Sequence, residues 1–214
     1  MSLNAVKELR EKTGAGLLDC QKALGEASGD VDKALRLLRE RGIAKAAKKA
    51  TRLATDGQVG AYIHPGGKIG VLIEVNCETD FVAKTEEFQR LVRDLAMQVA
   101  ASGPRYVRRE EVPEAEIENE RQIYRVQAEK SGKPAQVIER IVTGQLDRYF
   151  QDTCLLEQAY IKQSDRTVGD VLKEAIVRFG VNVDVRRFTR FQLGENIGRQ
   201  AGEKDSASGG DAGA

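Results

Sequence analysis

The sequence predicts an α+β protein in which a bundle of short helices precedes a helical core with a small antiparallel β-sheet. Three observations support this fold class. Apolar side chains recur at helical spacing through residues 1–42, between glycine-containing breaks. Between residues 59 and 75 the period changes to two around a Pro-Gly-Gly turn, which is typical of a β-hairpin. After residue 85 the helical period returns.

Composition limits the possible function classes. The 214 residues are 41% hydrophobic and 31% charged, which indicates a globular protein. With 34 basic and 33 acidic residues, the net charge of +1 argues against a general nucleic-acid binder. No apolar run could span a bilayer, and the first residues lack the basic and apolar segments of a secretory signal. We therefore expect a cytoplasmic protein that binds no membrane. The distant cysteines Cys20, Cys77 and Cys154 fit reduced thiols.

Residues 1–42 are predicted to form a three-helix domain. The turn Thr13-Gly14-Ala15-Gly16 separates the first two helices, and Asp30 is a suitable N-cap for a third helix that stops near Gly42. Each helix has one apolar stripe, so the three bury their stripes against one another. The stripes consist of Leu3, Val6 and Leu9; of Leu17, Leu18, Ala23, Leu24 and Ala27; and of Val31, Ala34, Leu35 and Leu38.

Residues 43–56 are predicted to be a linker helix. Alanine and lysine favour a helix there, but no wide apolar face exists, so we expect a solvated connection. The alternative is a local RNA-binding surface formed by Arg39, Arg41, Lys45, Lys48, Lys49 and Arg52.

Residues 57–194 are predicted to form the α+β core, which begins with the hairpin. Its first strand would bury Val59, Ala61 and Ile63, and its second strand Ile69, Val71, Ile73 and Val75. The segment Thr79–Lys84 is then a short connection to a helix capped by Thr85.

Later parts of the core follow from caps and periodicity. Pro113 and Pro134 begin two helices, and Thr167 to Asp170 resembles a capping box for a last helix. A final strand changes phase after Val185, which predicts a bulge near Arg186-Arg187. Residues 195–214 are almost free of apolar side chains other than alanine and are predicted to be a disordered tail.

The sequence contains no convincing catalytic or ligand-binding motif. His64 lies in a Pro-Gly turn, and no cysteines or histidines have metal-ligand spacing. Gly66-Gly67-Lys68-Ile69 lacks the first glycine and the final Ser or Thr of a phosphate-binding loop. We expect no cofactor, metal or direct nucleotide binding. The acidic residues Glu74, Glu78 and Asp80 leave one enzymatic alternative, acid–base work by paired carboxylates.

Phe81 stands out because it follows Asp80 in a short connection between strand and helix. It could pack under the hairpin as part of the core. An exposed Phe81 would instead suit insertion into a partner, because buried aromatic side chains often anchor interfaces.

Two stretches closely resemble the signatures of the elongation factor Ts family. The first runs from Leu9 to Cys20 (LREKTGAGLLDC) and the second from Glu74 to Lys84 (EVNCETDFVAK). The resemblance continues through residues 45–50 to Arg187-Phe188 and Leu193-Gly194, and so covers nearly everything but the tail.

The resemblance implies a bundle similar to ubiquitin-associated domains and a non-enzymatic exchange activity. Such factors bind elongation factor Tu and promote the release of GDP, so that GTP can enter. Asp80, Phe81, Val82 and Ala83 would be pushed toward the partner's Mg²⁺ site. Gly14, Ala15, Gly16 and Lys22 would make a second contact from the N-terminal bundle.

Two departures from the family pattern affect these expectations. Gln21 stands where the family usually has a lysine. The chain also shows one hairpin where longer members hold two related core halves and an inserted coiled coil, so a homodimer is plausible. Two rival functions remain: an adaptor for which the first 42 residues suffice, and a ribosome- or RNA-associated protein.

Overall fold

The computed structural model describes residues 3–13, 15–130 and 132–195, apart from the side chains of residues 43 and 45. Gly14 and nearly all of the predicted tail therefore lie outside the described residues. Helices pack on one face of a three-stranded antiparallel sheet, and a two-stranded sheet lies elsewhere in the described chain, which confirms the predicted α+β class. The main elements are α1 (Leu3–Thr13), α2 (Leu17–Glu26), α3 (Val31–Ala50), β1 (Asp56–Ile63), β2 (Ile69–Cys77), α4 (Asp80–Ala83), α5 (Glu86–Ser102), α6 (Glu114–Glu129), α7 (Ala135–Thr153), β3 (Ala159–Tyr160), β4 (Gln163–Thr167), α8 (Val168–Phe179) and β5 (Val183–Gln192).

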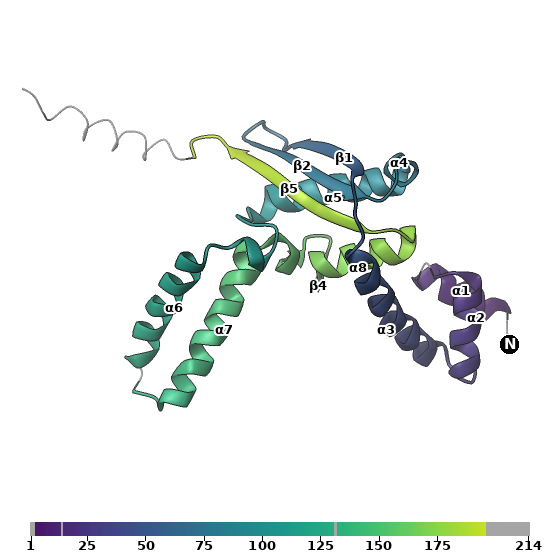
Figure 1. Cartoon of the computed structure of the whole chain (residues 1–214), viewed down its shortest axis with the longest axis horizontal. Coiled ribbons are helices and arrows are strands. Elements are labelled where there is room, and N and C mark those ends of the chain that lie inside the picture. Colours follow the sequence, from purple (N-terminus) through teal and green to yellow (C-terminus); the bar gives the residue numbers. More distant parts are fainter. Residues whose placement is uncertain (1–2, 14, 131, 196–214) are drawn as a thin grey trace, which may run out of the picture.

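The described chain has three separate hydrophobic clusters. They lie in the three parts of the molecule that Figure 1 shows, namely the sheet layer, the N-terminal bundle and the α6–α7 hairpin. The largest lies between the sheet β1-β2-β5, helix α5 on one face of that sheet, and α8. A second cluster holds α1, α2 and α3 together, and a third joins α6 to α7. The N-terminal bundle and the α6–α7 hairpin extend from the sheet layer as two separate arms.

The sheet buries the face of β1 opposite to the one that the sequence predicted. Val59, Ala61 and Ile63 are exposed, and Gly60 and Tyr62 face the core instead. The prediction for β2 was right, since Val71, Ile73 and Val75 are buried. Antiparallel register places Gly60 opposite Ile73, so those two residues share the face that α5 covers. Alternation showed that the two faces of β1 differ, but not which of them α5 covers.

Helix α3 is continuous through Gly42, so the predicted stop there and the separate linker helix are wrong. A single glycine costs a helix only about 1 kcal/mol, and the alanines and lysines that follow favour continuation. An added Cβ at Gly42 would meet Val177 of α8 at 3.5 Å, so a small residue suits the contact. Ala46 is buried in the largest cluster. The segment therefore packs on the core and is not a solvated linker.

The N-terminal bundle has the three predicted helices, but some of its leucines face solvent. Val6, Leu9, Ala23 and Leu24 are buried as expected. Leu3, Leu17 and Leu18 are exposed, whereas Cys20 takes a core position on α2. With only 10 residues, α2 is too short to bury every apolar side chain against two neighbours.

Several local predictions are confirmed. The side chains of Asp30 and Thr85 cap α3 and α5, and Thr167 with Asp170 forms a capping box. The register between β2 and β5 shifts at Arg186, where the bulge was expected. The sequence did not predict the two-stranded sheet β3–β4. The α6–α7 hairpin projects from the core, although the short chain suggested no such insert.

Candidate functional site

Helix α4 occupies the segment that was predicted to be a short connection. It begins because the Thr79 Oγ1 accepts a hydrogen bond from the backbone N–H of Val82, at 3.5 Å. A threonine followed by an acidic residue is a sequence signal for a helix start, and it was overlooked here. One turn is enough because Thr85 then caps the next helix, α5.

The four predicted site residues of α4 divide into two pairs. Val82 and Ala83 are half-buried and pack on the largest cluster, so they hold the helix against the sheet layer. Phe81 points away and is 80% exposed, which excludes the core alternative for its ring. An exposed phenylalanine on an anchored turn is available to a partner.

Asp80 forms an ion pair along the same turn. Its Oδ2 lies 2.6 Å from the Lys84 Nζ, four residues later. This hydrogen bond from Lys84 lowers the pKa of the Asp80 carboxyl, and Asp80 raises the pKa of Lys84 in return. The exposed face of α4 therefore presents one aromatic ring beside a carboxylate that stays ionised at neutral pH.

The N-terminal site residues lie at the start of α2. Gly16 is the N-cap, with φ of −61° and ψ of 150°, and Ala15 packs partly on the bundle. Lys22 is exposed in the second turn of α2. The exposed Leu17 and Leu18 flank this group, and the sequence analysis had assigned both to the core. The start of α2 packs on the hydrophobic cluster of the N-terminal bundle, whereas α4 packs on the largest cluster.

The acidic residues considered for acid–base catalysis do not form a pair. Glu74 binds Arg187 at 2.7 Å, Glu78 accepts the backbone N–H of Asn182, and Asp80 binds Lys84. Each carboxylate thus has its own partner, which leaves no shared proton site.

Other chemistry is equally poorly supported within the described ranges. The His64 Nδ1 lies 3.1 Å from the Tyr62 hydroxyl, and no described His, Cys, Asp or Glu group could hold a metal ion. No helix in the described part of the chain is long and apolar enough to cross a membrane.

Several of the basic residues considered for RNA binding make contacts within the protein. Arg41 pairs with Glu26, Arg52 with Glu78, and the Lys49 Nζ donates to the carbonyl of Gly180. These contacts hold α3 to its neighbours. The RNA alternative therefore receives no support from the geometry.

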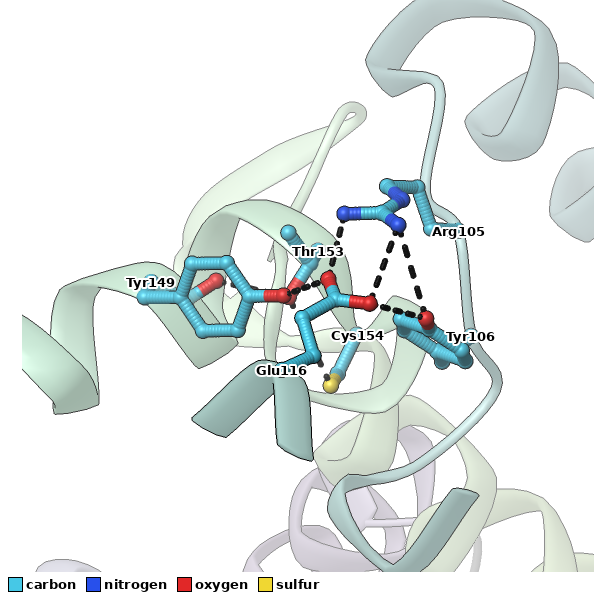
Figure 2. Close-up of polar contacts among 6 residues, drawn as sticks. All are labelled: Arg105, Tyr106, Glu116, Tyr149, Thr153 and Cys154. Atoms are coloured by element: carbon cyan, nitrogen blue, oxygen red, sulfur yellow. Dashed lines mark hydrogen bonds and ion pairs between the residues drawn. The ribbon is translucent and has the colours of Figure 1, made fainter. Parts of the chain in front are cut away.

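A cluster of polar side chains lies at the base of the α6–α7 hairpin (Figure 2). Glu116 of α6 accepts hydrogen bonds from Tyr149 of α7, from Tyr106 at 2.8 Å and from Arg105 at 3.1 Å. These donors, Tyr149 first, lower the pKa of Glu116, whereas burial raises the pKa of Tyr149 and Tyr106.

Two features of this cluster favour a structural connection between the hairpin and the core over a catalytic centre. Arg105, Tyr106 and Tyr149 all direct their donors at the one Glu116 carboxylate, as Figure 2 shows. The cluster joins α6, α7 and the segment that leads to them from α5, so it ties the hairpin to the core.

Comparison with known proteins gives a consistent result over most of the chain. The family model described as Elongation factor TS matches residues 43–195. A protein named Elongation factor Ts from Carboxydothermus hydrogenoformans is 58% identical over 203 residues, covering 95% of this chain and 93% of that relative. Proteins of the same name from Thermoanaerobacter sp. strain X514 and Citrifermentans bemidjiense are 54% and 56% identical, over 95% and 97% of this chain and 100% and 96% of their own lengths.

Proposed function

Because this chain belongs to the elongation factor Ts family, we propose that it binds elongation factor Tu loaded with GDP and promotes the release of that nucleotide. The family places the chain among translation elongation factors. In the proposed reaction no covalent bond changes, so the protein acts as an exchange factor and not as an enzyme. We propose that it does so in the cytoplasm. The observation that carries the proposal is the 80% exposure of Phe81 on an anchored turn.

We propose that Phe81 acts as a wedge near the partner's Mg²⁺ site. GTPases hold their nucleotide partly through Mg²⁺ that bridges protein and phosphate oxygens, so displacement of the ion's ligands loosens GDP. Burial of a phenylalanine ring in a partner contributes about 1.5–3 kcal/mol toward such a displacement. Val82 and Ala83 keep the ring in place because they are packed against the core.

Asp80 has a supporting role in this proposal. Its carboxylate stays ionised beside Lys84 and competes for polar groups of the partner near Phe81. Partner and nucleotide weaken each other's binding by the same factor, because coupling between two sites is reciprocal. Excess GDP should therefore dissociate the complex.

The start of α2 is proposed as a second contact with the partner. Ala15, Gly16 and Lys22 lie there beside the exposed Leu17 and Leu18, which supply apolar area next to a cation. Gly14 belongs to the same loop in sequence. We take the three-helix bundle as the ubiquitin-associated-like domain that the family resemblance implies, and a small apolar surface of this kind suits protein binding.

We further propose a symmetric homodimer that uses the open face of the sheet. Val59 and Ile63 of β1 are 65% and 66% exposed, and Leu72 of β2 and Phe191 of β5 lie on the same face by register. No described helix covers this face, whereas α5 covers the other one. A face of this kind can pack on its own copy, as sheets do in sandwiches.

Release of a fluorescent GDP analogue from elongation factor Tu tests the exchange function. The parent chain should accelerate release at catalytic amounts, and Phe81→Ala should slow it by about ten-fold, since 1.4 kcal/mol corresponds to that factor. Val126→Ala is the matched control, because it also removes an exposed apolar side chain, on α6 and far along the chain from α4.

Thermal unfolding of the same samples separates function from folding. The Phe81→Ala chain should melt with the parent, because an exposed ring supports little core. A stable Phe81→Ala chain with parental exchange would remove Phe81 from the mechanism. If the chain is instead an adaptor without exchange activity, adding the parent chain should leave the rate of GDP release unchanged.

A further inference from the structure

A buried asparagine joins the end of α3 to the turn before β5. Asn182 is only 4% exposed, and its side-chain Nδ2 donates to the carbonyls of Arg52 at 2.7 Å and Ala50 at 3.3 Å. These carbonyls close the C-terminal end of α3, where the helix itself provides no N–H partner. One side chain thus holds the end of the helix that carries the N-terminal bundle.

The same residue also holds the segment that leads into α4. The backbone N–H of Asn182 donates to the Glu78 Oε1 at 2.5 Å, and the Glu78 Oε2 faces the Arg52 guanidinium at 3.6 Å. Glu78 lies two residues before Asp80, the first residue of α4. Asn182, Glu78 and Arg52 therefore form a closed junction between the end of α3 and the start of α4.

The bundle is joined to the core mainly through α3. The extensive contacts are those of α3 with α8. On the bundle side of that contact, a cleft of about 570 Å³ separates α1 and α3 from α8 and is lined by Lys12, Leu38, Asp170 and Val177 among others. The bundle thus takes its orientation from α3, through the packing of that helix on α8 and through the junction at its C-terminal end.

We propose that Asn182 is a positioning residue that holds the two partner-binding surfaces, the start of α2 and the turn of α4, at one separation. This inference rests on the proposed exchange function. Two contacts on a rigid body bind a partner more tightly than either alone, because the second contact forms at a high effective concentration. Loss of the junction lowers that effective concentration and so weakens binding of the partner. Once the partner is saturated, Phe81 should release GDP at the same rate as in the parent chain.

Pulsed electron paramagnetic resonance on the full chain tests the rigidity. Spin labels would be placed on Lys33→Cys of α3 and Gln89→Cys of α5, both of which are exposed. Cys20, Cys77 and Cys154 are buried, so labelling should be selective. Asn182→Ala should widen the distance distribution between the labels relative to the same labelled chain with Asn182.

The matched control is Gln158→Ala. Gln158 is also a buried amide that donates to a backbone carbonyl, that of Asp152, but it does not touch α3. Gln158→Ala should leave the distance distribution between the labels narrow, even if it lowers the stability of the chain as much as Asn182→Ala does. Equal widening by Gln158→Ala, or an unchanged distribution with Asn182→Ala, would overturn the inference.

Exchange kinetics provide the second readout. For Asn182→Ala, the partner concentration that gives half of the maximal rate should rise by about ten-fold, which is part of the affinity that two linked contacts typically add. The maximal rate should stay at the parental value. A fall in the maximal rate alone, or no change at all, would contradict the positioning role.

Two further measurements keep the test decisive. Should Asn182→Ala fail to fold, Glu78→Gln retains an acceptor for the Asn182 N–H but loses the charge that faces Arg52, and it should shift the half-maximal concentration in the same direction by less. If the parent chain releases no GDP, the proposed function fails and the inference with it. If the parent chain is active and both variants match it, only the inference fails.

Discussion

Substitution of Gly60 by alanine tests which face of β1 is buried. A Cβ added at Gly60 would lie 2.4 Å from the Val92 Cγ1 of α5, well inside van der Waals contact. Val92 is 1% exposed and branched at Cβ, so its methyl group cannot rotate away freely. Either the valine leaves its rotamer or α5 moves away from the sheet.

The cost follows from the packing of the interior. Overpacking by one methyl group in a filled core costs about 1–3 kcal/mol. For a chain of this length, each kcal/mol lowers the melting temperature by about 2–4 °C. A central cost of about 2 kcal/mol therefore lowers the melting temperature of Gly60→Ala by about 4–8 °C.

Gly70→Ala is the matched control on the neighbouring strand. Its added Cβ would lie 3.1 Å from the Ile63 Cδ1, the flexible end of a side chain on the open face of the sheet. Neither glycine has a positive φ, so alanine is compatible with both backbones. Gly70→Ala should be neutral or slightly stabilising, by about 0.4–1 kcal/mol, because it restricts the unfolded chain.

Scanning calorimetry is the suitable assay, because three separate hydrophobic clusters give reason to expect more than one transition. Val92→Ala provides room for the new methyl group, so the double variant Gly60→Ala/Val92→Ala should be more stable than the sum of the single effects by about 0.5–3 kcal/mol. If Gly60→Ala and Gly70→Ala melt at the same temperature, α5 does not pack on Gly60 and the assignment of faces is wrong.

Two other regions of the structure allow direct tests. Glu116 has a lowered pKa in the folded chain, so its contribution to stability is present above its ordinary pKa of 4.5 and is lost as the pH falls through the folded value. Urea unfolding should show Glu116→Gln to be less stable than the parent by about 1–3 kcal/mol at pH 7, with a smaller difference at pH 3; an equal difference at both would contradict the sign. On the open face of the sheet, Leu72→Glu should convert the proposed dimer to a folded monomer in sedimentation velocity, and a dimer that survives would place the interface elsewhere.

Local structure could be predicted from the sequence wherever neighbouring residues decide it. The caps by Asp30, Thr85 and Thr167 depend on side chains that lie within three residues of the groups they bind. The bulge at Arg186 followed from a change of phase inside one strand. The elongation factor Ts resemblance was confirmed by the family match and by relatives at 54–58% identity.

Errors arose where a helix or strand could pack in more than one way. Gly42 looked like a stop, but α3 continues past it and Val177 of α8 lies beside it. Leu17 and Leu18 looked like core residues, but Cys20 faces the bundle interior instead. Each pattern was locally consistent with both arrangements, and contacts with distant segments decided between them.

For the candidate site, the sequence by itself led to the proposal of the stretch from Glu74 to Lys84 and drew attention to Phe81. Only the tertiary structure decided that the Phe81 ring is exposed, because its exposure depends on Val82 and Ala83 filling the space against the sheet. The same holds for Asn182, which lies 104 residues from Glu78 and 130 from Arg52 along the chain. Periodicity and motifs describe interactions between near neighbours, whereas a junction between residues this far apart exists only once the chain has folded.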